Sequence, residues 1–130
     1  MEVLLGTIAY IAVTFPLAIA WHMKVFYKLY KEWHYFGNSP KPIIGLLAIV
    51  IQGFVLSYGY GLIDVVHESL FSGLAYSAVM GFFFWTCHVL SYMAKNEKTR
   101  QWKFLMMESV YLSVQFGLFG IMIALIHRMI

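Results

Sequence analysis

The sequence has few charged residues and a single cysteine. Of its 130 residues, 12% are charged and 62% are hydrophobic, a balance typical of membrane proteins and far from that of soluble domains. Because Cys87 has no second cysteine beside it, the chain forms no intramolecular disulfide and no zinc site built from paired cysteines. A phosphate-binding loop and a G-x-S-x-G motif are also missing. These absences disfavour the enzyme classes that depend on such groups, and we assign no catalytic residue.

Four apolar stretches predict an all-α membrane protein, a bundle of four transmembrane helices forming one domain over residues 1–130. A helix needs about 20 apolar residues to cross a bilayer. The stretch 69–94 has 26 residues without a formal charge, and two more stretches of 21 uncharged residues lie at 3–23 and 43–63. Since Glu2 precedes the first stretch where a signal peptide carries Lys or Arg, we expect this helix to be retained. The predicted spans are 3–27, 43–66, 69–94 and 103–127.

Basic residues gather in the first and third connections between these spans. Eight of the nine lie there, and only Arg128 lies elsewhere. By the positive-inside rule, these two loops face the cytoplasm and both termini face outward, which indicates a multi-pass protein of the cell (inner) membrane. The eight residues are Lys24, Lys28, Lys31, Lys41, Lys95, Lys98, Arg100 and Lys103.

The segment 24–35 is predicted to continue the first helix past the membrane surface. Lys24, Lys28 and Lys31 share one face and reach lipid phosphates, while Phe26, Tyr30 and Trp33 repeat that spacing on another face, at the headgroup boundary. Basic and aromatic runs also occur in nucleic-acid-binding segments. Beside a transmembrane helix the membrane-surface interpretation is favoured, so the expected partner is the lipid bilayer and no nucleic acid. The four tryptophans are interpreted as an interfacial belt.

Small residues recur every fourth position in three spans, which predicts close helix packing in lipid. We expect Phe82, Phe83, Val89 and Leu90 to face lipid instead. The lipid-facing sides of the helices and the rows of small residues also favour a homo-oligomer or docking onto a larger membrane complex. The predicted packing residues are Gly53, Ser57, Gly61, Gly73, Ser77, Gly81, Ser113 and Gly117.

Three ionisable residues fall at similar depth near the basic loops: His22, His88 and Glu108. Ionisable groups inside membranes are costly and mark functional sites. Gln115 lies seven residues after Glu108, on the same helix face. We expect Glu108 to face the first and third helices within hydrogen-bond reach of a histidine or a tyrosine. The group would relay protons, hold a divalent metal, or only fix helix register.

The opposite side carries acidic residues and two more histidines, His67 and His127. We interpret this side mainly as a solvated acidic surface. Two histidines on facing helices are also what a haem with two imidazole ligands requires. His22 and His88 would then share one haem b, and His67 and His127 another, although the second pair lies at the very ends of its spans.

Three short segments carry a resemblance to a known family. They are Trp21-His22-Met23-Lys24-Val25-Phe26 through Trp33, the run from Ser72-Gly73 to Gly81, and Phe104-Leu105. In this layout the chain resembles an uncharacterised bacterial family of small four-span membrane proteins, a domain of unknown function. The resemblance implies architecture and no mechanism.

Two classes of function stay open. In the first, the protein is a non-catalytic accessory or scaffold subunit of a membrane assembly, and its polar residues specify packing. In the second, it is a small proton or solute transporter, or a haem- or metal-binding protein, that uses His22, His88 and Glu108. We place the accessory class ahead, because no span has the density of polar groups usual in a permeation path.

Overall fold

The computed structural model describes residues 1–130 and is built entirely of helices and their connections. Four helical segments are long and apolar enough to cross a membrane, so the predicted all-α membrane bundle is confirmed. The first is α1 (Glu2–Ala18) with the π-helical turn η1 (Ile19–Val25), and the second is α3 (Pro42–Leu62). The third is formed by α4 (Leu70–Trp85), the π-helical turn η2 (Thr86–Leu90) and α5 (Ser91–Lys95); the fourth is α6 (Trp102–Met129).

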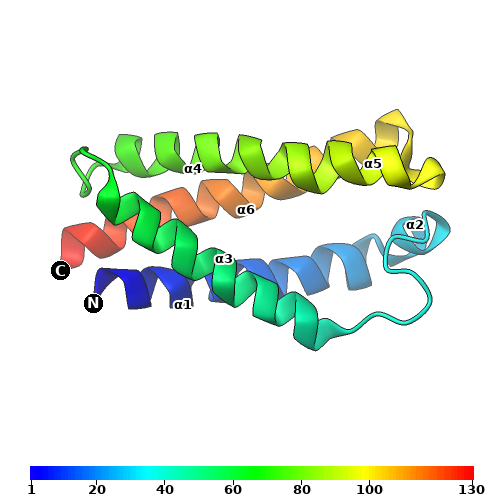
Figure 1. Ribbon diagram of the computed structural model, residues 1–130, viewed down its shortest axis with the longest axis horizontal. Helices are drawn as coiled ribbons and strands as arrows, with labels where there is room; N and C mark the ends of the chain where they lie inside the picture. Colours follow the sequence, from blue (N-terminus) through cyan, green and yellow to red (C-terminus); the bar gives the residue numbers. More distant parts are fainter.

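The four segments lie lengthwise in one elongated bundle (Figure 1). Helix α6 packs against α4 and α1, while α3 packs mainly on α1 and crosses it obliquely. Both termini and the connection 63–69 lie at one end, called the terminal end below. The short helix α2 (Tyr27–Glu32), α5 and the 3₁₀ turn η3 (Glu97–Thr99) lie at the other, called the loop end. The two predicted basic loops therefore share one end of the molecule.

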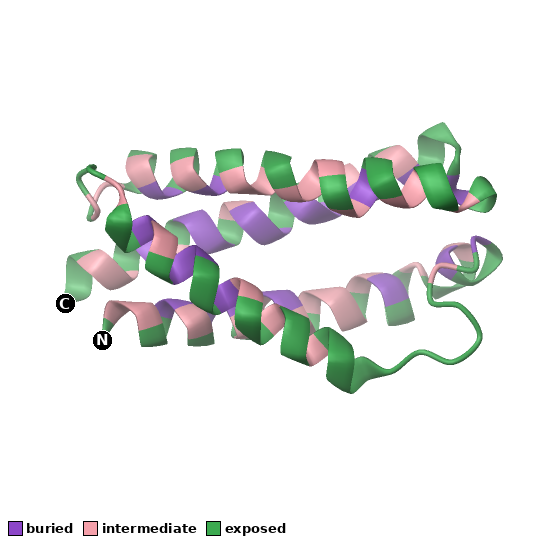
Figure 2. Cartoon of the chain, viewed as in Figure 1, coloured by how far each residue is buried: buried purple, intermediate pink, exposed green.

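Helix α6 is the most enclosed of the four spans. In the most apolar part of α6, 44% of the residues are buried, against 28% or less in the other three spans. The buried residues follow the inner faces of the helices, whereas the loop-end half of α3 is exposed (Figure 2). The second span ends at Leu62, short of the predicted residue 66, because Ile63 has extended backbone (φ −84°, ψ 146°).

Small residues allow close packing of α4 on α6 and of α1 on α3. Several of them are at the positions that the four-residue spacing predicted. A Cβ atom on Gly73 would lie 2.3 Å from the Gly120 carbonyl oxygen, so these two backbones touch. Gly53 packs on the ring of Tyr10, and Gly81 on the ring of Phe116. Ser57 and Ser77 are also buried within the bundle.

Three predicted packing positions are wrong. A Cβ atom added to Gly61 or Gly117 would meet no other part of the bundle within 4 Å, and Ser113 is exposed. Helix α6 turns Phe116 and Gly120 toward α4, which rotates Ser113 and Gly117 to the edge of that interface, while Gly61 lies in the last turn of α3, before the chain leaves the helix.

We predicted that the first helix continues through residues 24–35, but it ends at Val25. At Phe26 the backbone leaves the helical region (φ −111°, ψ 21°), and α2 begins afresh at the next residue. Positive φ angles at His34 (50°) and Gly37 (65°) then turn the chain away. Because α2 folds over the loop end, Tyr30 and Trp33 are buried in the bundle and not at the headgroup boundary. Trp33 is therefore no part of an interfacial belt.

Both spans that carry the loop-end histidines contain a π-helical turn. His22 lies within η1, and His88 lies within η2. A π-helical turn adds a residue to the helical repeat and shifts the register of the side chains that follow it. Val89, expected to face lipid, is accordingly fully buried.

Candidate functional site

A fully buried carboxylate, that of Glu108, lies at the centre of a polar cluster near the loop end. Glu108 is 0% exposed and belongs to the second turn of α6. His22 Nε2 lies 2.9 Å from its Oε1 atom, and His88 Nε2 lies 3.0 Å from its Oε2 atom. The expected contact of Glu108 with these histidines is therefore present, and it joins the first, third and fourth spans.

Two aromatic side chains from the first span and α2 complete the environment of Oε1. The Tyr30 hydroxyl donates a hydrogen bond to Glu108 Oε1, and the Trp21 indole N–H donates to the Tyr30 oxygen at 3.0 Å. Because an indole N–H can only donate, the Tyr30 hydroxyl proton is directed at the carboxylate. The fold of α2 over the bundle end is what brings Tyr30 to this position.

The contacts of His22 show that the His22–Glu108 pair carries one more proton than a neutral imidazole and an ionised carboxylate would. His22 Nδ1 lies 3.0 Å from the Ala18 carbonyl oxygen, which can only accept. Nε2 faces the Glu108 carboxyl group. A neutral imidazole carries one N–H, so both contacts are satisfied only if His22 is an imidazolium or Glu108 is a carboxylic acid. The pair therefore shares one proton in a site that is nearly closed to water.

His88 links this pair to the solvent-accessible surface. Its side chain is 33% exposed, whereas those of His22 and Glu108 are 5% and 0% exposed. His88 Nε2 also lies 3.0 Å from the Tyr35 hydroxyl. As an N–H this nitrogen donates to Glu108, and as a lone pair it accepts from Tyr35. His88 can therefore alternate between two protonation states without leaving its position.

The turn after α2 covers the cluster. The Tyr35 ring stacks on the His22 imidazole, with centroids 5.2 Å apart and planes 8° apart. The Tyr92 hydroxyl of α5 donates to the Tyr35 carbonyl oxygen at 2.7 Å, which ties the turn to the third span. Burial, and then the negative charge of Glu108, raises the pKa of Tyr30 and of Tyr35 above the ordinary value for tyrosine. Both phenols therefore remain hydrogen-bond donors at neutral pH.

Gln115 is not part of this cluster, contrary to our prediction. Its Nε2 atom donates to the Tyr10 hydroxyl at 2.8 Å, and that hydroxyl lies 3.3 Å from Gln52 Oε1. Glu108 and Gln115 are seven positions apart, which places them two helical turns apart, about 10 Å along the axis. Tyr111 lies between them on α6 and packs edge to face against His22. Gln115 thus forms a second polar group deeper in the bundle.

The cluster does not fit a metal ion or a haem. No group of three or more His, Cys, Asp or Glu side chains is arranged to hold a metal ion. The Nε2 atoms of His22 and His88 are each directed at an oxygen of Glu108, which lies between them where a shared iron would have to bind. At the terminal end, the rings of His67 and His127 stack nearly parallel, so their nitrogens do not point at one iron from opposite sides.

Tyr30, Tyr35 and Trp21 were not identified as site residues from the sequence. Because the run 24–35 was interpreted as a surface helix, its aromatic residues were placed at the lipid boundary. The one signal in the sequence is the expectation that a tyrosine would reach Glu108. Nothing in the spacing shows which of the nine tyrosines does so.

Comparison of the chain with protein-family models, with curated proteins and with solved structures found no match.

Proposed function

We propose that this protein is a small proton transporter of the cell membrane whose proton-binding site is the His22–Glu108–His88 cluster. The observation that carries the proposal is that His22 faces the Ala18 carbonyl oxygen with one ring nitrogen and the Glu108 carboxyl group with the other. These two contacts require a proton shared between His22 and Glu108 inside a membrane span. Buried ionisable residues within spans mark proton pathways in pumps and transporters. Two π-helical turns at the histidines add support, since such turns are frequent at functional sites.

The proposed exchange runs through His88. The shared proton lies on His22 with Glu108 as its counter-ion, and His88 bonds the other oxygen of the same carboxylate. When His88 takes up a proton at Nδ1 and releases the one at Nε2, Nε2 accepts from Tyr35 instead. Glu108 Oε2 then loses one donor and becomes a better proton acceptor. The proton then passes from His22 to the carboxylate and on to His88, which is partly exposed at the surface of the bundle near the loop end. The loop end is proposed to face the cytoplasm, as the positive-inside rule predicts.

Proton flux into liposomes tests this proposal. We expect protein-containing liposomes under an imposed membrane potential to take up protons faster than empty liposomes. Glu108→Gln and His88→Gln should abolish the excess, because each removes a proton acceptor from the cluster. The matched control is Asp64→Asn, which removes a carboxylate outside the spans and should leave the flux unchanged. Flux equal to that of empty liposomes, or unaffected by Glu108→Gln, would refute the proposal.

The membrane orientation is tested separately. Single cysteines introduced at Lys28 and at Met129, in a Cys87→Ser background, report the loop end and the terminal end. A membrane-impermeant thiol reagent added to intact cells should label position 129 and not position 28. The reverse pattern would show that the basic loops face outward.

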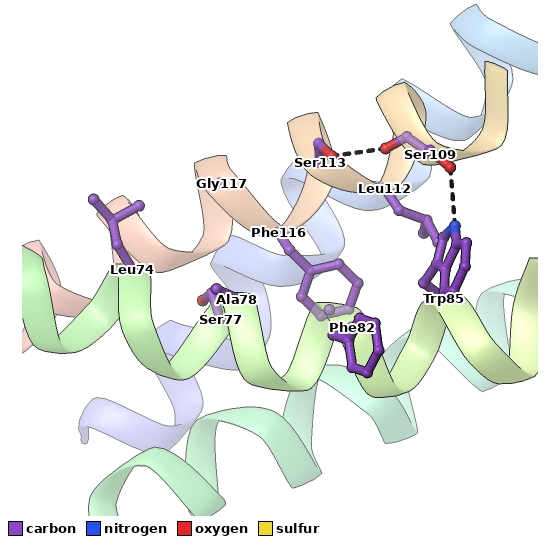
Figure 3. A pocket seen from close by; sticks show the side chains of 11 residues that line it. Leu74, Ser77, Ala78, Phe82, Trp85, Ser109, Leu112, Ser113, Phe116 and Gly117 are labelled. Atoms are coloured by element: carbon purple, nitrogen blue, oxygen red, sulfur yellow. Dashed lines mark hydrogen bonds between the residues drawn. The ribbon is translucent and has the colours of Figure 1, made fainter. Parts of the chain in front are cut away.

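The second candidate function is that of an accessory subunit, and a groove between α4 and α6 favours it (Figure 3). The groove has a volume of about 630 Å³, and six of its eleven lining residues are small, Gly81 and Ser113 among them. At one end Trp85 Nε1 donates to Ser109 Oγ at 2.9 Å. Close approach of another helix is easiest over small residues. The partner of such a contact would be a second copy or another membrane subunit.

Disulfide crosslinking tests this second function. In a Cys87→Ser background, Ser113→Cys places a thiol in the groove, and Val55→Cys places one on the exposed face of α3. If copies associate through the groove, Ser113→Cys should crosslink in native membranes and Val55→Cys should not. Equal crosslinking at both positions would indicate random collision, and a heterologous crosslinked band would indicate a different subunit.

A further inference from the structure

A hollow lined by charged side chains lies at the loop end, between α2 and the beginning of α6. It has a volume of about 390 Å³. Glu32 of α2, Lys98 of η3 and Lys103 of α6 line it. Gln101, the N-cap residue of α6, completes its polar lining. The hollow shares no residue with the groove between α4 and α6 or with the Glu108 cluster.

The three charged side chains that line the hollow form no ion pair with one another or with any other residue. The ion pairs of the protein lie elsewhere, at Glu108 and at the N-terminus. Arg100 lies between the two lysines in the sequence, but its guanidinium group donates to two carbonyl oxygens of α5 at 2.9 and 2.8 Å. Two ammonium groups and one carboxylate, those of Lys98, Lys103 and Glu32, can therefore interact with a ligand.

Buried contacts behind the hollow hold its walls in place. Trp33, which also lines it, packs edge to face on Phe104 with ring centroids 5.2 Å apart. Asn96 Nδ2 donates to the Trp33 carbonyl oxygen at 3.2 Å, and Asn96 Oδ1 accepts from the Lys98 backbone N–H at 3.1 Å. This bridge fixes the end of α2 relative to η3. Because the site is formed before a ligand binds, less entropy is lost on binding.

The ends of the membrane spans place this hollow in the layer of lipid headgroups. The first span ends at Val25 and the fourth begins at Trp102. The hollow is lined by residues that follow the first span or adjoin the start of the fourth. The headgroup layer on each side of a bilayer is about 5–8 Å thick. A phospholipid beside the bundle therefore brings its phosphate to the level of the hollow.

We propose that this hollow binds the headgroup of a phospholipid that carries a primary ammonium group, as phosphatidylethanolamine does. The lipid phosphate accepts hydrogen bonds from the ammonium groups of Lys98 and Lys103, and the lipid ammonium group donates to the Glu32 carboxylate. Glu32 repels a headgroup that has only negative charge, so the three side chains together select a headgroup with both charges. This site is independent of the proposed proton transport.

Native mass spectrometry of the protein in detergent, with equal amounts of three lipids, tests the site. Phosphatidylethanolamine, phosphatidylcholine and phosphatidylglycerol all carry a phosphate, but only the first adds an N–H donor. We expect the complex with one lipid to contain phosphatidylethanolamine about threefold more often than either of the others, as one additional exposed ion pair allows. Equal occupancy by the three lipids, or a preference for phosphatidylglycerol, would overturn the proposal.

Two variants separate the two halves of the headgroup. Lys98→Gln combined with Lys103→Gln should weaken binding of all three lipids, because each carries a phosphate. Glu32→Gln should keep phosphate binding and abolish the preference for phosphatidylethanolamine over phosphatidylcholine. The matched control is Lys24→Gln combined with Lys28→Gln, which removes the same charge from the same end of the molecule but outside the hollow. The control should leave the preference unchanged.

Two further outcomes would also contradict the site. An equal loss of lipid in the control variant would show that general attraction between the basic loops and phosphates explains the binding. Soluble glycerophosphoethanolamine, added in excess, carries the same headgroup without acyl chains and should not displace the lipid. Displacement would show that the hollow recognises a soluble phosphate compound.

Discussion

His22 and Glu108 are 86 positions apart in the sequence, yet His22 Nε2 lies 2.9 Å from Glu108 Oε1. This contact fastens the end of the first span to the beginning of the fourth at a point closed to water. A buried ion pair of this kind adds little net stability when intact, because desolvation offsets the attraction. Removal of one partner is costly, since the other is left buried without compensation.

Replacement of Glu108 by leucine should destabilise the bundle by about 3 kcal/mol, since it leaves the donors of His22, His88 and Tyr30 without an acceptor. Glu108→Gln has nearly the same shape and retains an acceptor oxygen, so its cost should be about 1 kcal/mol. Reversible unfolding in mixed detergent micelles measures both values. Equal stability of the leucine variant and the unchanged protein would show that the network contributes nothing to the fold.

The raised pKa values of Tyr30 and Tyr35 predict a loss of stability at alkaline pH. Above the ordinary tyrosine pKa near 10, the unfolded chain releases protons that the folded chain keeps, so the free energy of unfolding falls as pH rises. Below that pH the contribution is fully present. The double variant Tyr30→Phe, Tyr35→Phe should be less stable at pH 8 but show a flatter decline between about pH 10 and 12. Parallel declines of both proteins would contradict this assignment.

Gly73 and Gly117 provide a matched pair for the α4–α6 contact. Gly73→Ala forces a Cβ atom to within 2.3 Å of the Gly120 carbonyl oxygen, a backbone atom that cannot rotate away. We expect a cost of about 1–3 kcal/mol from this overpacking. Gly117→Ala meets no atom within 4 Å and gains helix propensity, so it should be neutral or stabilising. Unfolding measurements that rank the two variants in the opposite order would show that the helices pack differently.

The hydrogen bond from Gln115 to Tyr10 should be measurable as a coupling between the two side chains. Interhelical hydrogen bonds in membranes contribute about 0.6 kcal/mol on average and up to about 1.7 kcal/mol. A double-mutant cycle with Gln115→Leu and Tyr10→Phe should therefore give about 1 kcal/mol. A coupling indistinguishable from zero would show that Gln115 and Tyr10 do not interact.

The span architecture was predictable from the sequence because hydropathy and length decide which segments cross a bilayer. The structure of the loop end was not predictable, because the break at Phe26 and the fold of α2 depend on the tertiary packing of Tyr30 and Trp33. The helical spacing of the aromatic residues continues unchanged through that break. His22, His88 and Glu108 were found from the depth of ionisable residues. The π-helical turns that aim both histidines leave no mark in the spacing. Gln115 was wrongly assigned to the cluster because it shares a helix face with Glu108, whereas it lies two turns deeper and bonds Tyr10.

Nitrogen-15 NMR of the His22 ring in lipid nanodiscs at neutral pH, recorded with the carboxyl carbon signal of Glu108, tests the central claim most directly. The account predicts one proton shared by the pair, seen as hydrogens on both His22 nitrogens beside an ionised Glu108. Glu108→Gln should remove the hydrogen from one of those nitrogens. A neutral His22 beside an ionised Glu108 in the unchanged protein would contradict the account, because no proton would then be stored between them.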